Sequence, residues 1–337
     1  MISLLVTGGC GFIGSNFINY IFDETKYKIV NLDAMYYCAA ETNIEPHIRA
    51  HPTHYKFIKG NLCAEDLVNY ILENHQITHV IHFAAQSHVQ NSFEDSIQFT
   101  HDNILGTHTL LEVCKRYGKI EKFIHVSTDE VYGESMLSDE DAQKKTEQSI
   151  LCPTNPYAAT KAGAELIAQA YYHSFKFPVI ITRGNNVYGP NQYPEKLIPK
   201  FIEQLSQNKP VTIQGDGSCM RAFLHASDAA KAFEVILSKG QIGEIYNIGC
   251  HQGMEYSVLE IAHKLIKKIK KIPDQDANQD ANQNTTESEE KIKEWIKYVE
   301  DRPFNDTRYY ISNQKLLDLG WKIEKDFETG IDELIHE

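Results

Sequence analysis

The sequence has no long apolar run, and none of its stretches approaches the roughly 18 residues that a membrane-spanning helix needs. Its seven cysteines are odd in number and lack CxxC spacing, which argues against a disulfide framework and against a zinc site. The 15 histidines show no HExxH or comparable pattern, so no metal is expected. Residues 1–6 carry no basic charge, so no export signal is expected. We therefore expect a cytoplasmic protein with reduced thiols.

Positive charge is scarce as well. With 33 Lys and Arg against 46 Asp and Glu, the formal net charge is −13, which argues against binding through nucleic-acid phosphates. A local basic pocket for one small anionic ligand stays possible. The 42% hydrophobic and 23% charged residues are typical of a globular protein, and 337 residues allow a large core. We expect two lobes that share one cleft.

Three glycines follow the first apolar run. Gly8, Gly11 and Gly14 stand in GxxGxxG spacing between a predicted strand at 2–6 and a predicted helix at 15–22. Glycines at this spacing let backbone N–H groups approach a pyrophosphate. A second predicted strand, 27–32, ends at Asp33, about 20 residues after the loop, where a carboxylate binds the ribose of NAD and repels the extra phosphate of NADP. The pattern predicts NAD binding, and a purely structural glycine turn is the alternative.

The strand and helix signals continue to alternate along the first half of the chain. Predicted strands at 55–60, 78–85 and 122–126 alternate with predicted helices at about 64–75 and 98–117. This alternation indicates an α/β fold with a doubly wound parallel sheet of the Rossmann type. The small residues Ala84 and Ala85 end one of these strands, and they would let a cofactor lie close to the backbone. Residues 134–149 are expected to form an exposed acidic loop.

A hydroxyl and two adjacent carboxylates follow the strand at 122–126. Thr128, Asp129 and Glu130 would lie at the carboxyl end of that strand, which is where open α/β sheets bind ligands. Different surroundings can give two neighbouring carboxyl groups different pKa values, so that one donates a proton while the other accepts one. The alternative is a solvated Asp-Glu turn, since acidic residues are mostly exposed.

A tyrosine and a lysine are spaced for one face of a helix. Tyr157 and Lys161 stand at i and i+4, so an ammonium would lie near a phenol and lower the pKa of that phenol from its usual value of about 10. The alternative is a surface pair. After a dinucleotide loop and an Asp-Glu strand end, this spacing favours a catalytic pair.

Eight segments carry a resemblance to a known family: TGGCGFIGSN, HFAAQSHV, HVSTDEVYG, NPYAATKAGAE, RGNNVYGPNQYPEKLIPKFI, GDGSCMRAFLH, YNIG and EDRPFNDTRY. Together they resemble the extended short-chain dehydrogenase/reductase family, and within it the nucleotide-sugar 4,6-dehydratases, over nearly the whole chain. NPYAATKAGAE, RGNNVYGPNQ and RPFND are more similar to the dehydratase domain of plant rhamnose synthases and to animal dTDP-glucose dehydratase-like proteins than to bacterial dTDP-glucose 4,6-dehydratases. UDP-glucose and dTDP-glucose are both candidate substrates.

The resemblance implies a hydro-lyase that serves deoxysugar biosynthesis, of the rhamnose or amino-deoxysugar type, and a homodimer formed through two helices per subunit. NAD would oxidise the glucose at C4, water would leave across C5 and C6, and C6 would then be reduced to give a 4-keto-6-deoxy sugar. Tyr157, assisted by Lys161, would take the C4 hydroxyl proton, and Thr128 would hydrogen-bond the same oxygen. Glu130 would remove the C5 proton, and Asp129 would protonate the leaving C6 hydroxyl.

The resemblance also divides the chain and assigns its contacts. Residues 1–182 would form the NAD-binding domain with the catalytic residues, and 183–337 would form mainly the nucleotide-sugar lobe, with some return of the chain to the first domain. Cofactor contacts fall on Gly8, Gly11, Phe12, Ile13, Gly14, Asp33, Asn61, Leu62, Ala84, Ala85, Tyr157 and Lys161. Substrate contacts fall on Ser87, Asn186, Lys196, Leu197, Arg221, Asn247, Arg302 and Asn305. Gln86, Gln90, Asn61 and Asn305 depart from bacterial members. Asn61 can still hydrogen-bond an adenine edge, whereas Gln90 and Asn305 border the substrate side and leave the sugar-nucleotide preference open.

Three further expectations complete the sequence analysis. Residues 274–290, with an imperfect DANQ duplication and no apolar anchor, are expected to be a disordered surface insertion. A nucleotide-sugar C4 epimerase would share the NAD loop and the Tyr157-Lys161 pair, but it would not need Asp129 and Glu130. A non-catalytic NAD-binding sensor or scaffold is the other alternative, and intact Thr128, Tyr157 and Lys161 argue against it.

Overall fold

The computed structural model describes residues 1–135, 144–251, 253–273, 289–301 and 306–336. Most of the expected insertion at 274–290 and half of the expected acidic loop at 134–149 therefore lie outside the described residues. Across the described ranges, no helix is long and apolar enough to cross a membrane.

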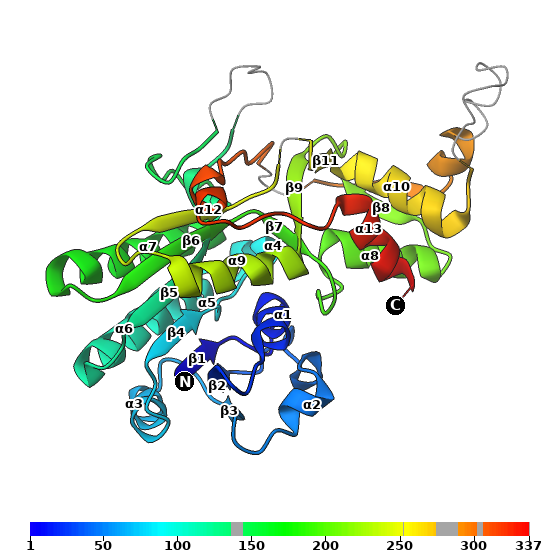
Figure 1. The fold of residues 1–337 in the computed structure, drawn as a ribbon. Helices are drawn as coiled ribbons and strands as arrows, with labels where there is room; N and C mark the ends of the chain where they lie inside the picture. The colour runs from blue at the N-terminus through cyan, green and yellow to red at the C-terminus, as the bar shows by residue number, and fades with distance from the viewer. Residues whose placement is uncertain (136–143, 252, 274–288, 302–305, 337) are drawn as a thin grey trace.

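A sheet of seven parallel strands forms the centre of the molecule, in the order β10-β6-β5-β4-β1-β2-β3 (Figure 1). The strands are β1 (Ile2–Thr7), β2 (Tyr27–Asp33), β3 (Tyr55–Lys59), β4 (His79–His82), β5 (Lys122–Thr128), β6 (Val179–Gly184) and β10 (Ile245–Ile248). Strand order reverses direction between β1 and β4, which is the switch point where such sheets bind ligands. This sheet confirms the predicted doubly wound α/β fold.

Helices cover both faces of the sheet, because successive residues of each strand point to opposite sides. On one face, Leu4 packs in a cluster with α1 (Phe12–Ile21) and α9 (Ala226–Lys239). On the other face, Leu5 packs in a cluster with α3 (Glu65–Asn74), α6 (Gly106–Tyr117) and α7 (Pro156–Phe175). The strands therefore have apolar side chains on both faces, as buried parallel strands do.

One predicted helix, at 98–117, differs from the structure. It consists of α5 (Ser96–Phe99), a π-helical segment η2 (Thr100–Leu105) and α6. Within η2, the buried Asn103 accepts a hydrogen bond from Gln86 N at 2.7 Å and donates from Nδ2 to Gln86 O at 3.0 Å and to Thr160 Oγ1 at 2.9 Å. Such π-helical turns occur mostly at functional sites, and this one ties the loop after β4 to α7.

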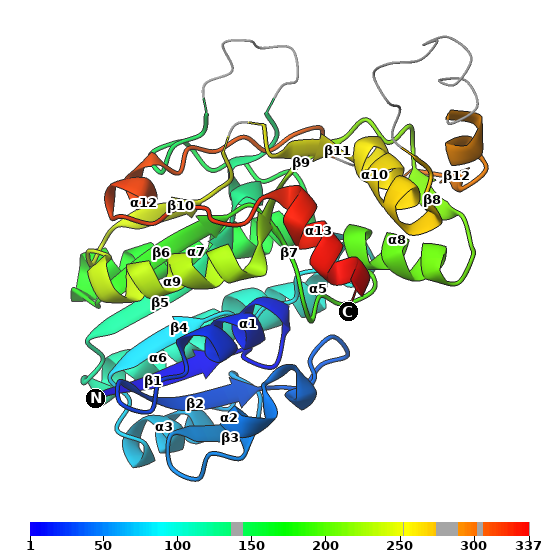
Figure 2. The same ribbon diagram turned by 45° about the vertical axis from the view of Figure 1, so that its right-hand side comes forward.

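The second lobe is built from two small sheets and the helices that pack against them (Figure 2). It contains the sheet β11-β9-β7 and the pair β12-β8, formed by β7 (Asn186–Tyr188), β8 (Val211–Gln214), β9 (Met220–His225), β11 (Glu255–Ser257) and β12 (Ile296–Val299), together with α8 (Leu197–Ser206), α10 (Val258–Lys270) and α13 (Phe327–His336). The expected boundary at residue 182 falls inside β6, and β10 and α9, which follow it in the chain, pack in the first domain.

Short elements occupy several of the remaining loops. They are η1 (Glu41–Asn43), α2 (Pro46–Arg49), α4 (Val89–Glu94), η3 (Asp129–Tyr132) and α12 (Gln314–Asp318).

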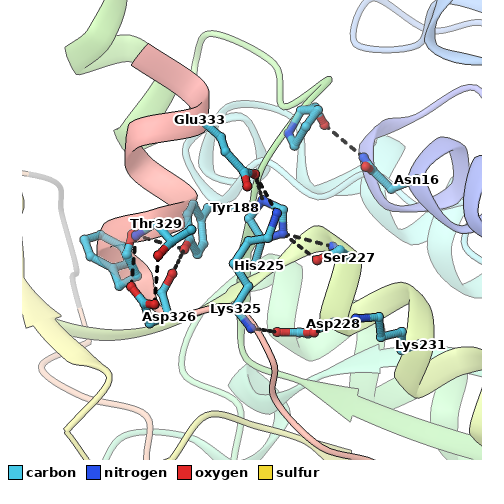
Figure 3. Close-up of polar contacts among 12 residues, drawn as sticks. Asn16, Tyr188, His225, Ser227, Asp228, Lys231, Lys325, Asp326, Thr329 and Glu333 are labelled. Atoms are coloured by element: carbon cyan, nitrogen blue, oxygen red, sulfur yellow. Dashed lines mark hydrogen bonds and ion pairs between the residues drawn. The ribbon is translucent and has the colours of Figure 1, made fainter. Parts of the chain in front are cut away.

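A side-chain carboxylate on α9 attaches the C-terminal segment to this helix (Figure 3). Asp228 Oδ2 accepts from the backbone N–H groups of Glu324 and Lys325 at 3.1 and 2.9 Å. His225 caps the start of α9, because its Nδ1 accepts from Ser227 N at 3.2 Å. Asp228 thereby attaches the segment just before α13 to α9.

A buried, neutral histidine should make the stability of the folded protein depend on pH. His82 is fully buried between the hydroxyls of Thr7 and Thr107, at 2.7 and 2.8 Å, and burial lowers its pKa to about 3. A proton therefore binds His82 in the unfolded chain, where its pKa is about 6.5, and not in the folded one, so the contribution is full above pH 6.5 and is lost as the pH falls.

We expect the free energy of unfolding to fall by about 2 kcal/mol more in the wild type than in His82→Gln between pH 7.5 and 5. The comparison with the variant is needed because Asp129, whose pKa is raised to about 7, contributes with the opposite sign over that range. Urea titrations at both pH values measure the difference. Parallel pH profiles for the two proteins would contradict the prediction.

Candidate active site

A cavity of about 330 Å³ opens at the carboxyl ends of β1, β2, β4 and β5. Every residue that the resemblance assigns to the cofactor lines this cavity, from the glycine loop through Asp33 and Asn61 to Tyr157 and Lys161. We call it the first cavity. Its walls come from segments that are far apart in sequence and meet only because parallel strands end at one edge of the sheet.

The glycine loop permits a close approach of backbone to backbone. Gly8 has a φ of 72°, and a Cβ there would lie 2.6 Å from Ala84 N. A Cβ on Gly14 would lie 2.4 Å from Gly8 O. No larger residue fits at either position, so the N-terminus of α1 packs against the end of β1. Its first backbone N–H groups are then available to an anion such as a dinucleotide pyrophosphate.

Backbone donors hold the carboxylate of Asp33 at the end of β2. Its Oδ2 accepts from Cys10 N at 2.9 Å, and its Oδ1 accepts from Met35 N at 2.8 Å. Burial raises the pKa of Asp33, and these backbone hydrogen bonds oppose the rise. The result is a fixed acceptor in the position where a dinucleotide fold binds a ribose.

The first residues of α7 place Tyr157 and Lys161 in the first cavity. Asn155 caps this helix by accepting from Ala158 N at 2.9 Å, and Pro156 occupies the first helical position. Lys161 Nζ donates to Val126 O at 2.6 Å, and burial lowers the pKa of Lys161 to about 8. At neutral pH the ammonium form of Lys161 therefore still predominates.

The structure corrects the expected pKa of the phenol. Burial raises the pKa of Tyr157, and the charges of Glu130 and Asp129 raise it further, while a hydrogen bond with Thr128 lowers it. The lowering expected from Lys161 does not outweigh these effects in the protein without bound ligand. A further positive charge in the first cavity would be needed to favour the phenolate.

The two adjacent carboxyl groups have different surroundings. Asp129 Oδ2 accepts from Asn185 Nδ2 at 2.6 Å, whereas Glu130 Oε2 accepts from Asn155 Nδ2 at 3.0 Å. Burial and the charge of Glu130 raise the pKa of Asp129 to about 7, and burial raises the pKa of Glu130. Glu130 lines the first cavity, while Asp129 is 1% exposed and lies behind the lining next to Thr128.

The sequence analysis missed two asparagines that hold this pair. Asn155 connects Glu130 to α7, and an Asn-Pro pair just before a helix was a signal that could have identified it as an N-cap. Asn185 has its amide orientation set by Cys250 N, which donates to Asn185 Oδ1 at 3.0 Å. Its partner lies 65 positions away in the chain, so no local pattern indicates this contact.

A second cavity of about 220 Å³ lies between the two lobes and shares Glu130, Asn186 and Lys196 with the first. Five of the expected substrate residues line it: Ser87, Asn186, Lys196, Leu197 and Arg221. Lys200, Asp306 and Tyr309 also line it, and the sequence analysis did not assign them. Lysine and arginine side chains at this place suit the phosphates of an anionic ligand.

Asn247, Arg302 and Asn305 are the remaining residues that were expected to contact the substrate. Asn247 does not line the cavities: it is fully buried in β10, accepts from Tyr132 Oη at 2.8 Å and donates to Ser312 O at 2.9 Å. Both ends of its amide are therefore used inside the fold, and its expected substrate contact stays a prediction that the two cavities do not support. Arg302 and Asn305 lie outside the described residues.

One group of possible metal ligands occurs in the described part of the chain, just before the start of β2 and of β3. Suitable atoms of Glu24, His51 and His54 lie within 4.8 Å of one another. His51 Nδ1 accepts from His54 N at 3.0 Å, so the ring proton lies on Nε2, which is 2.8 Å from Glu24 Oε2. This tautomer leaves no lone pair at Nε2 for a metal, and hydrogen bonding accounts for the arrangement.

Comparisons with known proteins agree with this site. A family model described as GDP-mannose 4,6 dehydratase matches residues 5–334. The trifunctional UDP-glucose 4,6-dehydratase/UDP-4-keto-6-deoxy-D-glucose 3,5-epimerase/UDP-4-keto-L-rhamnose-reductase of Arabidopsis thaliana is 47% identical over 98% of this chain and 46% of its own length. The chain thus spans about half the length of such plant relatives.

Two further relatives match over most of their length. The dTDP-D-glucose 4,6-dehydratase of Dictyostelium discoideum is 47% identical over 98% of this chain and 80% of its own length. The crystal structure of dTDP-glucose 4,6-dehydratase from Bacillus anthracis in complex with NAD superimposes with a TM-score of 0.84 and 36% identity, covering 100% of this chain and 96% of that one.

Proposed function

Because the chain belongs to the GDP-mannose 4,6 dehydratase family, we propose that it is an NAD-dependent nucleotide-sugar 4,6-dehydratase acting on UDP-glucose or dTDP-glucose. The observation that carries this proposal is the meeting of Glu130, Tyr157 and Lys161 around one cavity, with Asp129 directly behind it. A hydride-transfer enzyme without elimination would need only the tyrosine and the lysine.

The residues of the first cavity fit a dinucleotide. The Gly8–Gly14 cradle admits no Cβ where the pyrophosphate would approach, and Asp33 presents fixed oxygens for the ribose. When bound there, NAD⁺ supplies a hydride acceptor at C4 of the sugar and, after reduction, a hydride donor at C6. Its nicotinamide also supplies the positive charge that the phenolate of Tyr157 requires.

The side chains move the protons. Tyr157 takes the proton of the C4 hydroxyl, and the Thr128 hydroxyl positions the same oxygen, while the Lys161 ammonium stabilises the phenolate. A ketone at C4 acidifies the C5 hydrogen, which Glu130 removes as its base. Asp129, whose pKa is raised to about 7, holds a proton near neutral pH and gives it to the C6 hydroxyl, which leaves as water.

The two lobes divide the binding. We assign the cofactor and the catalytic groups to residues 1–182 and most of the nucleotide-sugar contacts to 183–337. Lys196 and Arg221 line the second cavity, where their charges would bind the sugar-nucleotide diphosphate. Relatives named for UDP-glucose and for dTDP-glucose match at the same 47% identity, so both nucleotides are tested.

The proposal is tested by incubating the purified protein with NAD⁺ and either UDP-glucose or dTDP-glucose and identifying the products by mass and by NMR. A 4,6-dehydratase yields a product lighter by one water, with a C6 methyl group. A C4 epimerase yields a product of unchanged mass, and a non-catalytic sensor yields none. Either of these outcomes with both nucleotides would overturn the proposed reaction.

We also infer a homodimer in the cytoplasm. Ile97, Leu105 and Leu166 are exposed apolar residues on α5, η2 and α7, and these helical segments pack against one another on one side of the first domain. Burying such a surface against its copy removes apolar area from water. Light scattering should give a mass twice the 38.5 kDa of the chain, and Leu166→Glu should halve it. A monomeric wild type would contradict the inference.

A further inference from the structure

Two loops on opposite sides of the first cavity meet on its solvent side. Tyr36, Cys38 and Ala39, in the loop after β2, line the cavity from the first domain. Tyr193 and Glu195, in the loop between β7 and α8, line it from the second lobe. Tyr37 is half exposed and is not part of the lining, yet its hydroxyl lies 2.9 Å from both carboxylate oxygens of Glu195. We call this hydrogen bond the Tyr37–Glu195 contact.

Neighbouring groups position both members of the contact. Asn91 Nδ2, on α4, donates to Tyr37 Oη at 3.2 Å, which leaves the phenolic proton for Glu195. The ring of Tyr37 lies edge-on to Tyr193, with ring centroids 5.3 Å apart. His88 Nδ1 lies 3.6 Å from Glu195 Oε2. Three segments, 35–40, 86–91 and 192–196, therefore converge at this point.

The base of each loop is firmly attached. Ala40 N donates to Cys10 O at 3.0 Å, beside the glycine loop, and Met35 N donates to Asp33. On the other side, Asn16 Nδ2, on α1, donates to Pro190 O at 2.9 Å. The loops can therefore part at their tips while their bases stay in place.

From this geometry we propose that Tyr37 and Glu195 are positioning residues that close the cofactor cleft and hold NADH in place until its hydride has returned to the sugar. The inference rests on the proposed function. In that reaction the hydride removed from C4 must come back to C6 of the same sugar. Loss of NADH between these steps leaves an oxidised 4-keto-glucose nucleotide and an enzyme without cofactor, so a slow release of NADH has a direct chemical purpose.

The contact is suited to closing and opening. Its donor is a phenol whose pKa is raised by burial and by Glu195, so it stays protonated and able to donate. Its acceptor is a carboxylate that lines both cavities and whose side chain is 19% exposed, and the bond to Tyr37 fixes the position of that charge. Because the contact is a single solvent-accessible hydrogen bond, it can break when cofactor enters.

The experiment measures NADH release without sugar. Enzyme loaded with NADH is mixed with excess NAD⁺ in a stopped-flow instrument, and the loss of NADH fluorescence gives the dissociation rate. Tyr37→Phe should release NADH about tenfold faster than the wild type, because one hydrogen bond to a charged group is lost. Glu195→Ala should behave alike, and Glu195→Gln, which keeps an acceptor oxygen, should stay within about threefold.

Tyr20→Phe is the matched control. Tyr20 is also a partly exposed tyrosine, 42% against 50% for Tyr37, and its hydroxyl donates to Glu234 at 3.1 Å, away from the cavity. This variant should release NADH at the wild-type rate. The double variant Tyr37→Phe/Glu195→Ala should be no faster than either single variant, because both remove the same contact.

Turnover provides a second measurement. Tyr37→Phe should need added NAD⁺ to sustain activity and should release some 4-keto-glucose nucleotide that has not lost water. A Tyr37→Phe release rate within twofold of the wild type, or multiplicative effects in the double variant, would overturn the proposal while leaving the dehydratase assignment intact. A wild type that does not bind NADH would overturn both.

Discussion

Tyr157→Phe should reduce turnover by about 10²- to 10⁴-fold while the protein still binds NAD, because the change removes the acceptor of the C4 proton and little else. Tyr157 lies 8% exposed on α7, and a phenylalanine ring fills nearly the same space. The fold should therefore be unchanged. Steady-state rates with the accepted nucleotide sugar, together with the NAD content of the purified variant, measure the two effects separately.

The control for this variant lies on the same helix. Tyr171 Oη donates to Glu112 Oε2 at 2.6 Å, and Tyr171 is absent from both cavity linings. Tyr171→Phe removes a phenolic hydroxyl from α7 and should leave turnover near the wild-type rate. Near-normal activity of Tyr157→Phe would remove Tyr157 from the mechanism. Equal losses in both variants would point to a general effect on α7.

Glu130→Gln should stop the reaction after the first hydride transfer. The amide can still accept from Asn155 Nδ2, which lies 3.0 Å from Glu130 Oε2, but it cannot take the C5 proton. Oxidation at C4 through Tyr157 should continue, so NADH and a 4-keto-glucose nucleotide should accumulate on the enzyme. The nicotinamide absorbance after addition of substrate follows this accumulation, and turnover should fall by about 10²- to 10⁴-fold.

Asp129→Asn separates the acid from the base. Asn185 Nδ2 can donate to either residue at this position, so the local contacts persist, but the acid that protonates the C6 hydroxyl is removed. Its defect should shrink with a substrate that carries fluoride at C6, because fluoride leaves without a proton. The Glu130→Gln defect should not shrink in this way. Normal turnover of Glu130→Gln without NADH accumulation would show that elimination does not use Glu130, and the epimerase would become the better assignment.

Patterns that depend on neighbours in the chain were predicted well from the sequence. The glycine loop joins β1 to α1, Asp33 ends β2, and Tyr157 and Lys161 are four residues apart on α7, so each feature lies within a short stretch of chain. Backbone sterics and hydrophobic period are sufficient to specify such features. The family followed from the same motifs, and the match of residues 5–334 to the family model confirms it.

Features that depend on distant partners were not predicted from the sequence. Asn247 belongs to a motif of the substrate lobe, yet β10 pairs with β6 in the central sheet and directs this side chain to Tyr132, 115 positions earlier. The π-helical segment η2 follows from the hydrogen bonds of Asn103 with Gln86 and Thr160, and hydrophobic period does not reveal them. In each case the partner of a polar side chain lies far away in the chain, so the contact depends on the tertiary structure.

The sequence by itself determined the α/β alternation and the cofactor loop, and it supplied the candidates for proton transfer, because each is a local arrangement of residue types. The tertiary structure alone decided the electrostatics. It raised the pKa of Asp129 to about 7 by burying that carboxyl beside Glu130, against the opposing hydrogen bond from Asn185, and it raised the pKa of Tyr157, which the sequence had indicated would fall. Burial and the distances between charges set these values, and both depend on how segments far apart in the chain pack together.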